Sequence, residues 1–323
     1  MEKRWIFAID LGGTTTKLAL LTEDGTLQEK WEIPTNLEGK GSHIVSDIGQ
    51  AFDSALERFG LERASFIGAG MGAPGPVVKG GVIKKAVNIG WENYPLQKEL
   101  EKVLGLPSFV ENDANCAALG EMWKGAGRGM ENVVCVTLGT GVGGGVIVNG
   151  EIVSGAGGAG GEIGHMTVQP ENGYMCNCGK TGCLETVASA TGVVRLAGEK
   201  LKSWDQPSPL KDLYEKKGSL TSKDVFDLAE ADPISAYVVD RVAYYLGSAF
   251  AAIGALLNPQ AIIVGGGVSK AGDKLLNPVR TYYERFAFPA SKSDTKILRA
   301  TLGNDAGVFG AGWLVRKGQV LTA

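Results

Sequence analysis

The chain has 323 residues, of which 44% are hydrophobic and 21% are charged, and its formal net charge at pH 7 is −3. A chain of this length and hydrophobic content is typical of about two domains with sizeable cores. Because there is no excess of basic residues, we expect no nucleic-acid partner. Nothing at the N-terminus resembles a secretory signal, so the five cysteines are expected to be reduced thiols in a cytoplasmic protein.

The first half of the chain opens with a predicted hairpin. Apolar residues at 5–9 and 17–21 predict two strands, and the polar, glycine-bearing stretch at 10–16 predicts the turn between them. The pattern that follows predicts helices at 43–59 and 95–104, strands at 66–71 and 107–110, and a helix at 114–123 that connects the two halves.

The second half opens on the same pattern. Strands are predicted at 133–137 and 146–148, with a glycine- and threonine-bearing turn at 138–145. Two copies of strand, turn and strand indicate a duplicated α/β unit. The elements predicted after this hairpin are helices at 224–229 and 233–257, a strand at 262–264 and a closing helix at 305–315.

Together these elements predict an α/β fold of two lobes around a cleft. We expect a small lobe at residues 1–118, to which a C-terminal helix at about 305–323 returns, and a large lobe at residues 119–304. Residues 242–269 carry no charge, but Asn258-Pro259 interrupts them, and the part before the break is too short to span a bilayer easily. A buried helix followed by a buried strand is expected there, and no membrane partner.

Three glycine-rich turns are candidate phosphate sites. Backbone N–H groups exposed by glycine, threonine hydroxyls and lysine are the groups that bind phosphate. The candidate residues are Asp10, Gly12, Gly13, Thr14, Thr15 and Lys17 in the first turn, Gly139, Thr140 and Gly141 in the second, and Gly265, Gly266 and Gly267 in the third. Asp10 is a candidate Mg²⁺ ligand, directly or through water. A single turn of this kind is also what an ordinary hairpin contains, so the argument depends on the matched pair. No P-loop motif occurs, and the G-x-G-x-x-G at Gly139 leads into a strand instead of a helix.

Four potential metal ligands lie close together in the sequence. His165, Cys176, Cys178 and Cys183 have the spacing H-x10-C-x-C-x4-C, which predicts a tetrahedral zinc site. Unrelated cysteines or a disulfide are the alternatives. Because four protein ligands leave no open position for substrate, we expect a structural ion that fixes the loop at 165–185 and orients the free nitrogen of His165.

Polar side chains that follow a strand suggest an acceptor site. Asp113 is placed either to cap the helix that follows it or to act as a general base in phosphoryl transfer. Glu162 and Glu185 flank the predicted zinc loop, although each is also compatible with a solvated surface carboxylate. A polyhydroxylated acceptor requires many such groups, and the candidates are Asn88, Asn112, Asp113, Glu162, His165 and Glu185.

The motifs resemble those of the ROK family (repressors, open reading frames and sugar kinases) over essentially the whole chain. The matching segments are IDLGGTTTK, GMGAPGPV, AVNIGWEN, ENDANCAALGE, TLGTGVGGGV, GGAGGEIGHM, CNCGKTGCLET and IIVGGGVS. Within the family they look like those of ATP-dependent bacterial glucokinases. The resemblance implies a duplicated actin-like (ribonuclease-H-like) ATPase fold and transfer of a phosphoryl group from ATP, with Mg²⁺, to the 6-hydroxyl of D-glucose.

The resemblance also implies roles for individual residues. Asp113 would be the catalytic base, and the glycine turns would hold the nucleotide, with Gly265–Gly267 near the adenosine. The sugar-site residues would be Gly75, Asn88, Asn112, Asp113, Glu162, His165 and Glu185, and the structural Zn²⁺ ligands His165, Cys176, Cys178 and Cys183. A homo-oligomer, either a dimer or a tetramer, is expected.

Other functions remain open at this stage. Another ROK kinase would phosphorylate mannose, fructose, N-acetylglucosamine or N-acetylmannosamine, since the motifs define the transfer machinery better than the group at C2. A sugar-sensing repressor requires a helix-turn-helix before the first strand, and that strand begins near Trp5. A non-sugar actin-like ATPase requires neither the zinc loop nor the Asn112-Asp113 pair.

Overall fold

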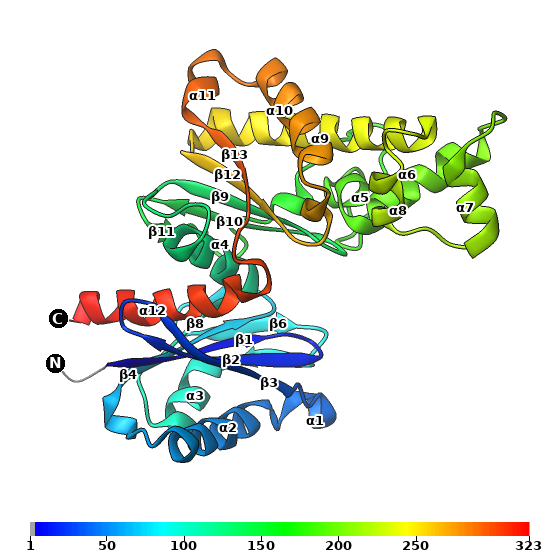
Figure 1. Ribbon diagram of the computed structural model, residues 1–323. Coiled ribbons are helices and arrows are strands. Elements are labelled where there is room, and N and C mark those ends of the chain that lie inside the picture. The colour runs from blue at the N-terminus through cyan, green and yellow to red at the C-terminus, as the bar shows by residue number, and fades with distance from the viewer. Residues whose placement is uncertain (1–3, 323) are drawn as a thin grey trace.

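The computed structural model describes residues 4–322 and contains two α/β lobes, each built on a five-stranded sheet (Figure 1). The first sheet has the order β3-β2-β1-β4-β8, antiparallel on the β2 and β3 side and parallel on the β4 and β8 side. Its strands are β1 (Trp5–Leu11), β2 (Thr15–Thr22), β3 (Leu27–Pro34), β4 (Phe66–Ala73) and β8 (Ser108–Asn112).

The second sheet repeats the arrangement of the first. Its order is β11-β10-β9-β12-β13, again with antiparallel pairs on one side of the central strand and parallel pairs on the other. The strands are β9 (Val133–Leu138), β10 (Val142–Val148), β11 (Glu151–Ile152), β12 (Ala261–Gly265) and β13 (Lys296–Arg299). The duplicated α/β unit predicted from the two hairpins is therefore confirmed.

Strand β1 is apolar from Trp5 to Ile9 because both of its faces are covered there. Successive side chains of a strand point to opposite faces. Phe7 and Ile9 lie in the core formed with helices α2 (Ile44–Phe59) and α3 (Leu96–Leu104), whereas Ile6 and Ala8 lie in the core on the opposite face. Strands that are covered on both faces generally lack an alternation of polar and apolar residues, and this part of β1 lacks it too.

The remaining elements surround these two sheets. A third sheet of three strands contains β5 (Val77–Val78), β6 (Val82–Ala86) and β7 (Trp91–Tyr94). The other helices are α1 (Glu38–Gly41), α5 (Glu185–Ala188), α6 (Ala190–Lys202), α7 (Pro209–Lys217), α8 (Ser222–Asp227), α9 (Pro233–Leu257), α10 (Asp273–Phe286) and α11 (Pro289–Asp294). Short 3₁₀ turns are η1 (Arg63–Ser65), η2 (Ile163–His165), η3 (Val268–Ala271) and η4 (Gly303–Asp305). None of the helices in the described part of the chain is long and apolar enough to traverse a bilayer.

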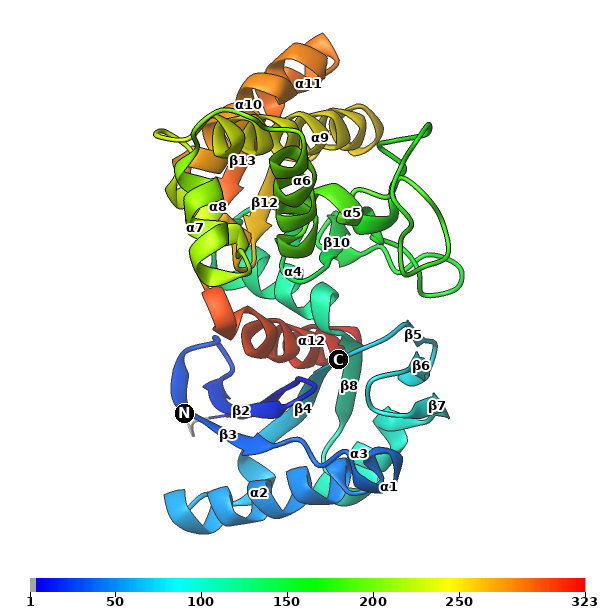
Figure 2. The same ribbon diagram turned by 90° about the vertical axis from the view of Figure 1, so that its right-hand side faces the viewer.

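Two helices, α4 (Asp113–Lys124) and α12 (Ala306–Thr322), lie between the sheets (Figures 1 and 2). Helix α12 covers β1 and β4 of the first sheet, and α4 packs on β9 and β10 of the second. The two helices cross at glycine, because a Cβ at Gly120 would lie 2.1 Å from the Ala306 oxygen and one at Gly310 would lie 1.7 Å from the Cys116 oxygen. Helix α12 lies in the segment at about 305–323 for which a helix was expected, and it packs against the first sheet.

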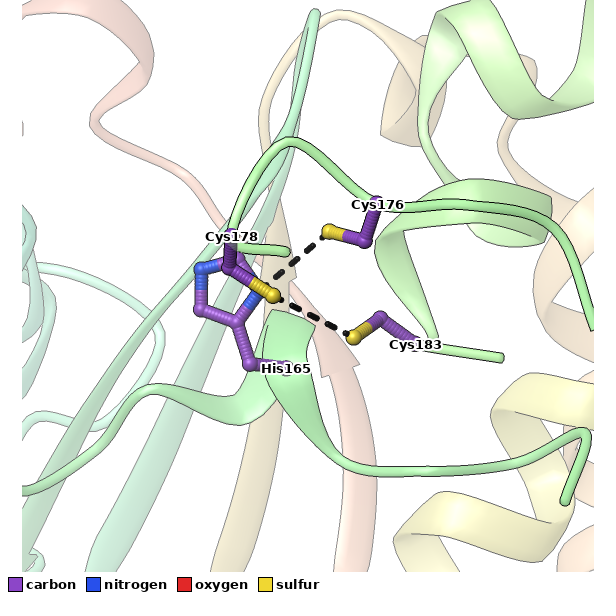
Figure 3. Close-up of side chains that lie close together, drawn as sticks. All are labelled: His165, Cys176, Cys178 and Cys183. Carbon is purple, nitrogen blue, oxygen red and sulfur yellow. Dashed lines mark hydrogen bonds between the residues drawn. The ribbon is translucent and has the colours of Figure 1, made fainter. Parts of the chain in front are cut away.

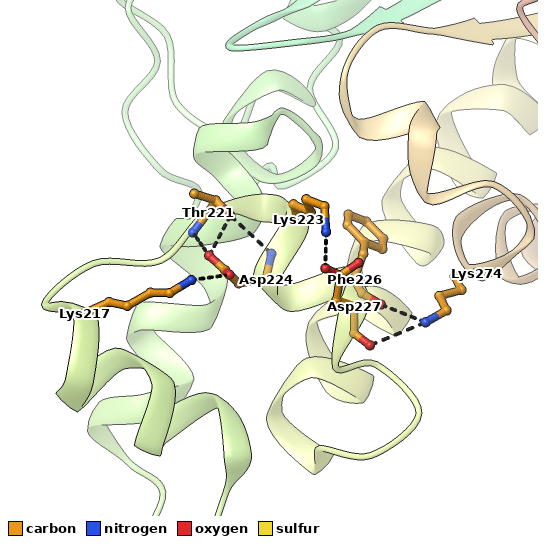
Figure 4. A network of polar contacts seen from close by, with 7 residues as sticks. All are labelled: Lys217, Thr221, Lys223, Asp224, Phe226, Asp227 and Lys274. Carbon is orange, nitrogen blue, oxygen red and sulfur yellow. Dashed lines mark hydrogen bonds and ion pairs between the residues drawn. The ribbon is translucent and has the colours of Figure 1, made fainter.

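Local side-chain contacts determine where helix α8 begins (Figure 4). The Asp224 amide donates to the Thr221 hydroxyl over 3.2 Å, and the Thr221 amide donates to the Asp224 carboxylate over 2.9 Å. This reciprocal pair is a capping box, which satisfies two N–H groups at the helix start. Lys217 adds an ion pair to Asp224 at 2.9 Å, and Lys274 of α10 donates to the last carbonyls of α8.

Both predicted glycine turns are shorter than expected. Strand β1 continues to Leu11 and β2 begins at Thr15, and Asp10 is paired with Lys17 in the ladder. Likewise, β10 begins at Val142, so the glycines that follow it are strand residues. These glycines allow helix α4 to approach the strand closely, because a Cβ at Gly145 would lie 2.5 Å from the Cβ of Ala118 on α4. The division of the chain at 118/119 stays a prediction, and α4 runs uninterrupted across it.

Candidate functional site

The first hairpin presents its tip to solvent and anchors its base by an ion pair. Gly13, Thr14 and Thr15 are exposed. The Lys17 Nζ lies 3.0 Å from the Asp10 Oδ2 and also donates to the Asn304 carbonyl over 3.0 Å. Lys17 therefore connects the hairpin to the segment that leads into α12. The exposed amides, hydroxyls and nearby ammonium group are chemically suited to bind phosphate.

The second and third predicted turns contact each other. Gly266 has φ +82°, and a Cβ there would lie 2.4 Å from the Leu138 carbonyl oxygen, which directly precedes the turn at 139–141. A cavity of about 270 Å³ opens beside them. Its lining includes Thr137, Gly265, Gly266, Gly267, Lys270, Arg299, Gly303 and Asn304. Since Asn304 also accepts from Lys17, the first hairpin is tied to the wall of the same cavity.

Asn112, and not Asp113, caps helix α4. The Asn112 Oδ1 accepts from the amides of Ala114 and Asn115 over 2.9 and 3.3 Å, while its Nδ2 donates to the Gly75 carbonyl over 3.1 Å. Gly75 has φ +94°, and a Cβ there would lie 2.4 Å from the Lys85 oxygen. Asn112 thereby joins the helix start to the loop after β4, and Asp113 is left as the first helical residue.

Asp113 is a carboxylate in an unfavourable environment for charge. Its Oδ1 accepts from the Ala114 amide over 2.8 Å. Solvent reaches the side chain, but the protein that surrounds it excludes most of its hydration, and this desolvation raises the pKa of Asp113. The nearby negative charge of Asp10 raises it further. Because the charge of Asp10 disfavours ionisation of Asp113 as well, Asp113 is poised to accept a proton.

The four predicted zinc ligands lie together (Figure 3). One ligand atom from each of His165, Cys176, Cys178 and Cys183 is within 4.8 Å of the others. The Cys178 and Cys183 sulfurs are 3.7 Å apart, and the Cys176 sulfur is 3.6 Å from His165 Nδ1. Zn–S bonds of about 2.3 Å at tetrahedral angles separate two sulfurs by about 3.8 Å. The donor set thus fits a tetrahedral Zn²⁺, and the three cysteines are free thiols rather than disulfide-bonded.

The imidazole of His165 has two different neighbours. Its Nδ1 faces Cys176, and its Nε2 faces the Glu162 carboxylate at 3.9 Å. The Lys180 ammonium donates to the His165 carbonyl over 3.0 Å. A metal held by Nδ1 leaves Nε2 directed away from the cluster, which is the arrangement expected from the sequence.

Glu185 connects the cysteine cluster with the second glycine turn. Its Oε1 lies 3.7 Å from the Cys176 sulfur, and its Oε2 accepts from the Val142 amide over 2.9 Å. A Cβ at Gly141 would lie 2.3 Å from the same oxygen, so a larger residue there would displace the Glu185 carboxylate. A carboxylate held in this way is not a free surface group. Asn88 differs from the other candidates, since it lies exposed in the turn between β6 and β7.

Several residues of the cavity were not predicted from the sequence. Asn304 contributes a backbone carbonyl, which every residue type has, so its role could not be inferred from the residue type. Lys270 and Arg299 line the cavity together with the glycines. Lys270 follows the predicted glycine run by three residues and could have been found from the strand before it. Arg299 ends β13, an edge strand of four residues that was not predicted.

The chain is similar to known proteins over nearly its whole length. The model of the ROK family matches residues 6–318. A glucokinase from Halalkalibacterium halodurans is 52% identical over 98% of this chain and 96% of its own, and one from Thermotoga maritima is 37% identical over 98% and 99%. The crystal structure of a ROK family glucokinase from Streptomyces griseus, in complex with glucose and AMPPNP, has a TM-score of 0.76 and 34% identity, covering 97% of this chain and 100% of that one. The predicted actin-like fold class is confirmed, and the chain belongs to the ROK family.

Proposed function

We propose that the protein is an ATP-dependent glucokinase, which transfers the γ-phosphoryl group of ATP to the 6-hydroxyl of D-glucose. The observation that carries the proposal is the position of Asp113, at the start of a helix, beside Asp10 and with a raised pKa. The 52% identity to a glucokinase over nearly the whole chain supports glucose as the acceptor.

In the proposed reaction, Asp113 accepts the proton of the sugar 6-hydroxyl as its oxygen bonds to the γ-phosphorus. The bond from that phosphorus to the bridging oxygen breaks, and ADP leaves. Lys17 and the exposed amides of the first hairpin neutralise charge on the phosphates, which is the main requirement of phosphoryl transfer. When Mg²⁺ is bound with ATP it neutralises charge on the β- and γ-phosphates. Asp10 provides the carboxylate oxygens that Mg²⁺ prefers, directly or through water.

The nucleotide is proposed to occupy the cavity beside Gly265–Gly267, with its phosphates between the two hairpin turns. Thr140 and Gly141 supply the second turn, and the Lys270 ammonium in the cavity lining suits an anionic ligand. The adenosine would lie toward the glycine run, where the left-handed Gly266 keeps the backbone close to Leu138.

The sugar is proposed to bind between the start of α4 and the cysteine cluster. Glu162, His165 Nε2 and Glu185 offer hydrogen bonds to hydroxyl groups on one side of the ring. Asn112 lies beside the proposed base, because its side chain hydrogen-bonds Asp113 in addition to the Gly75 carbonyl and the Ala114 amide. Gly75 contributes by orienting Asn112, since its carbonyl accepts from the Asn112 amide. Asn88 is proposed to lie at the rim of the sugar site.

Zn²⁺ is proposed as a structural ion held by His165, Cys176, Cys178 and Cys183. When bound, it would cross-link the loop and fix the tautomer of His165. No step of the transfer passes through it. Cytoplasmic location and a homo-oligomer, dimer or tetramer, stay predictions.

A coupled assay with ATP tests the proposed acceptor. The panel contains glucose, mannose, fructose, N-acetylglucosamine and N-acetylmannosamine, and kcat/KM is compared directly because specificity is a ratio of these values. Glucose is expected to have the highest value. A higher value for an N-acetylhexosamine would reject glucose as the preferred acceptor and leave a ROK kinase for another sugar.

A further inference from the structure

Glu121 is a buried carboxylate in helix α4 whose partners are backbone amides. The side chain is 3% exposed. Its Oε1 accepts from the amides of Thr301 and Leu302 over 3.0 and 2.8 Å, and its Oε2 accepts from the Ala126 amide over 2.9 Å. A buried charge is tolerated only when groups of this kind surround it. Both oxygens are therefore engaged as acceptors.

Two of these amides, those of Thr301 and Leu302, belong to the second place where the chain crosses between the lobes. Thr301 and Leu302 lie between β13 of the second sheet and α12, which packs on the first sheet. Helix α4 is the first crossing, since it follows β8 and precedes β9. A single side chain thus holds the two crossings together, at a point about 12 Å along α4 from Asp113 at 1.5 Å per residue.

The segment that Glu121 holds continues into the wall of the nucleotide cavity. Gly303 and Asn304 follow Leu302 directly and line that cavity, as does Glu121 itself. The Asn304 carbonyl accepts from Lys17, which is paired with Asp10. Displacement of the segment would therefore move a cavity wall and remove one partner of the lysine beside the phosphate turn.

We propose that Glu121 is a positioning residue for phosphoryl transfer. It holds the cavity wall at 303–304 and the Lys17 ammonium in a defined position relative to α4. These groups are thereby also positioned relative to the base Asp113, which lies at the start of that helix. Glu121 contacts neither substrate nor reacting atoms in this proposal. The inference rests on the proposed kinase function and adds a residue to it. The sugar-binding groups of the cysteine loop come from other elements and are independent of this contact.

The test is Glu121→Gln, which keeps the shape of the side chain. An amide has one acceptor oxygen, so its NH₂ group must face either the Ala126 amide or those of Thr301 and Leu302. At least one buried N–H then loses its acceptor, and the penalty for one such group corresponds to a change of about tenfold or more in an equilibrium constant. We expect KM for ATP and Kd for AMPPNP to rise by about that factor and kcat to fall. The Kd for glucose without nucleotide is expected to stay within about twofold.

Thr301→Val is the matched control. It removes the hydroxyl, whose 3.4 Å contact with Glu121 is marginal, and keeps the amide that Glu121 accepts from. Its kinetic constants are expected to equal those of the wild type. All variants are compared well below their Tm, measured by circular dichroism. A role in stability alone would lower Tm and leave KM for ATP, Kd for AMPPNP and kcat per folded molecule unchanged, and that result would overturn the proposal.

A second variant covers failure of the first to fold. Glu121→Asp retains the charge but withdraws the carboxylate by one methylene, so nucleotide affinity is expected to fall while glucose affinity is retained. Equal losses of both affinities, or no loss of either, would contradict the positioning role. AMPPNP binding is measured by calorimetry and does not depend on turnover. A wild-type protein that binds AMPPNP but does not phosphorylate glucose would instead reject the proposed function.

Discussion

Replacing Asp113 with asparagine tests the base in the proposed reaction while leaving the local structure in place. The Asp113 Oδ1 accepts from the Ala114 amide over 2.8 Å, and an asparagine oxygen accepts the same bond. The helix cap is also retained, because Asn112 provides it. The substitution therefore removes a proton acceptor from the site and little else.

The expected loss in kcat is about two to four orders of magnitude, the usual contribution of a positioned general base. Glucose binding should weaken much less, since an amide still hydrogen-bonds a hydroxyl. The Tm should not fall, and we expect it to rise at neutral pH. Burial and the charge of Asp10 raise the pKa of Asp113, so the ionised carboxylate opposes folding above that pKa and its removal relieves this cost.

The assay combines steady-state kinetics, calorimetric titration of glucose and a thermal scan of each protein. In the wild type, kcat/KM should fall as the pH decreases through the raised pKa of Asp113, at a higher pH than an ordinary aspartate would give. Asp10→Asn should move this limb to lower pH because one of the two causes of the shift is removed. Near-normal turnover by a folded Asp113→Asn protein would refute the assignment of the base.

Three further predictions concern the metal, the packing and the pH dependence of stability. Cys178→Ser should release the one zinc expected per chain and weaken glucose binding by about tenfold or more, because the loop that holds Glu185 loses its cross-link. The affinity for AMPPNP should be kept. Mass spectrometry measures the metal content and calorimetry the two affinities, and normal glucose binding by a metal-free variant would contradict the prediction. Gly310→Ala should lower the free energy of unfolding, measured in urea, by about 3 kcal/mol, because its Cβ would lie 1.7 Å from a carbonyl oxygen of α4. The control Gly198→Ala has open space around it and should raise the free energy of unfolding by about 0.5–1 kcal/mol. Equal effects of the two substitutions would exclude close packing as the cause. The Thr221 hydroxyl and Lys217 lower the pKa of Asp224 from 3.8 to about 2, so the stabilisation by its carboxylate is present above about pH 4 and is lost as the pH falls through about 2. Asp224→Asn should lower the free energy of unfolding by about 1 kcal/mol at pH 7. If the difference in free energy of unfolding between the variant and the wild type does not narrow in acid, the ion pair and the capping box do not cause it.

The parts of the fold that were predicted are those with a strong local pattern. Helix α2, for example, was predicted at 43–59 and observed at Ile44–Phe59, because its apolar residues recur at helical spacing. Strand β3 was missed, although alternate residues of Leu27–Pro34 are exposed and partly buried in turn. It is an edge strand with charged residues on its outer face, and such a pattern is typical of edge strands as well as of loops.

Glycine caused the main errors in the predicted bounds of the turns. Clusters of glycine were interpreted as turns, yet Gly144 and Gly145 lie in strand β10, where neighbouring backbone and side chains leave no room for a Cβ. Sequence pattern does not distinguish a glycine that bends the chain from one that admits a neighbour. The sequence spacing did identify His165, Cys176, Cys178 and Cys183 as a group, and the structure brings one ligand atom of each within 4.8 Å of the others. That they bind zinc stays a prediction.

The partners of Asn112 and Glu121 could not be predicted because they are backbone groups distant in sequence. Asn112 donates to Gly75, and Glu121 accepts from Thr301, which lies 180 positions further along the chain. A carbonyl or an amide is present at every position, so no residue type marks the partner. Only the topology, which brings both crossings to one place, determines which backbone groups these side chains reach.

The return of α12 to the first sheet has a consequence for biosynthesis. The face of β1 that carries Ile6 and Ala8 is covered by Val308 and Ala311 of α12, so a sheet that is synthesised early is completed by a helix that is synthesised much later. At about 5–20 residues per second, the chain between Asp113 and Asp305 takes about 10–40 s to synthesise. During this interval the first sheet exposes an apolar face, which is prone to aggregation until α12 has been synthesised.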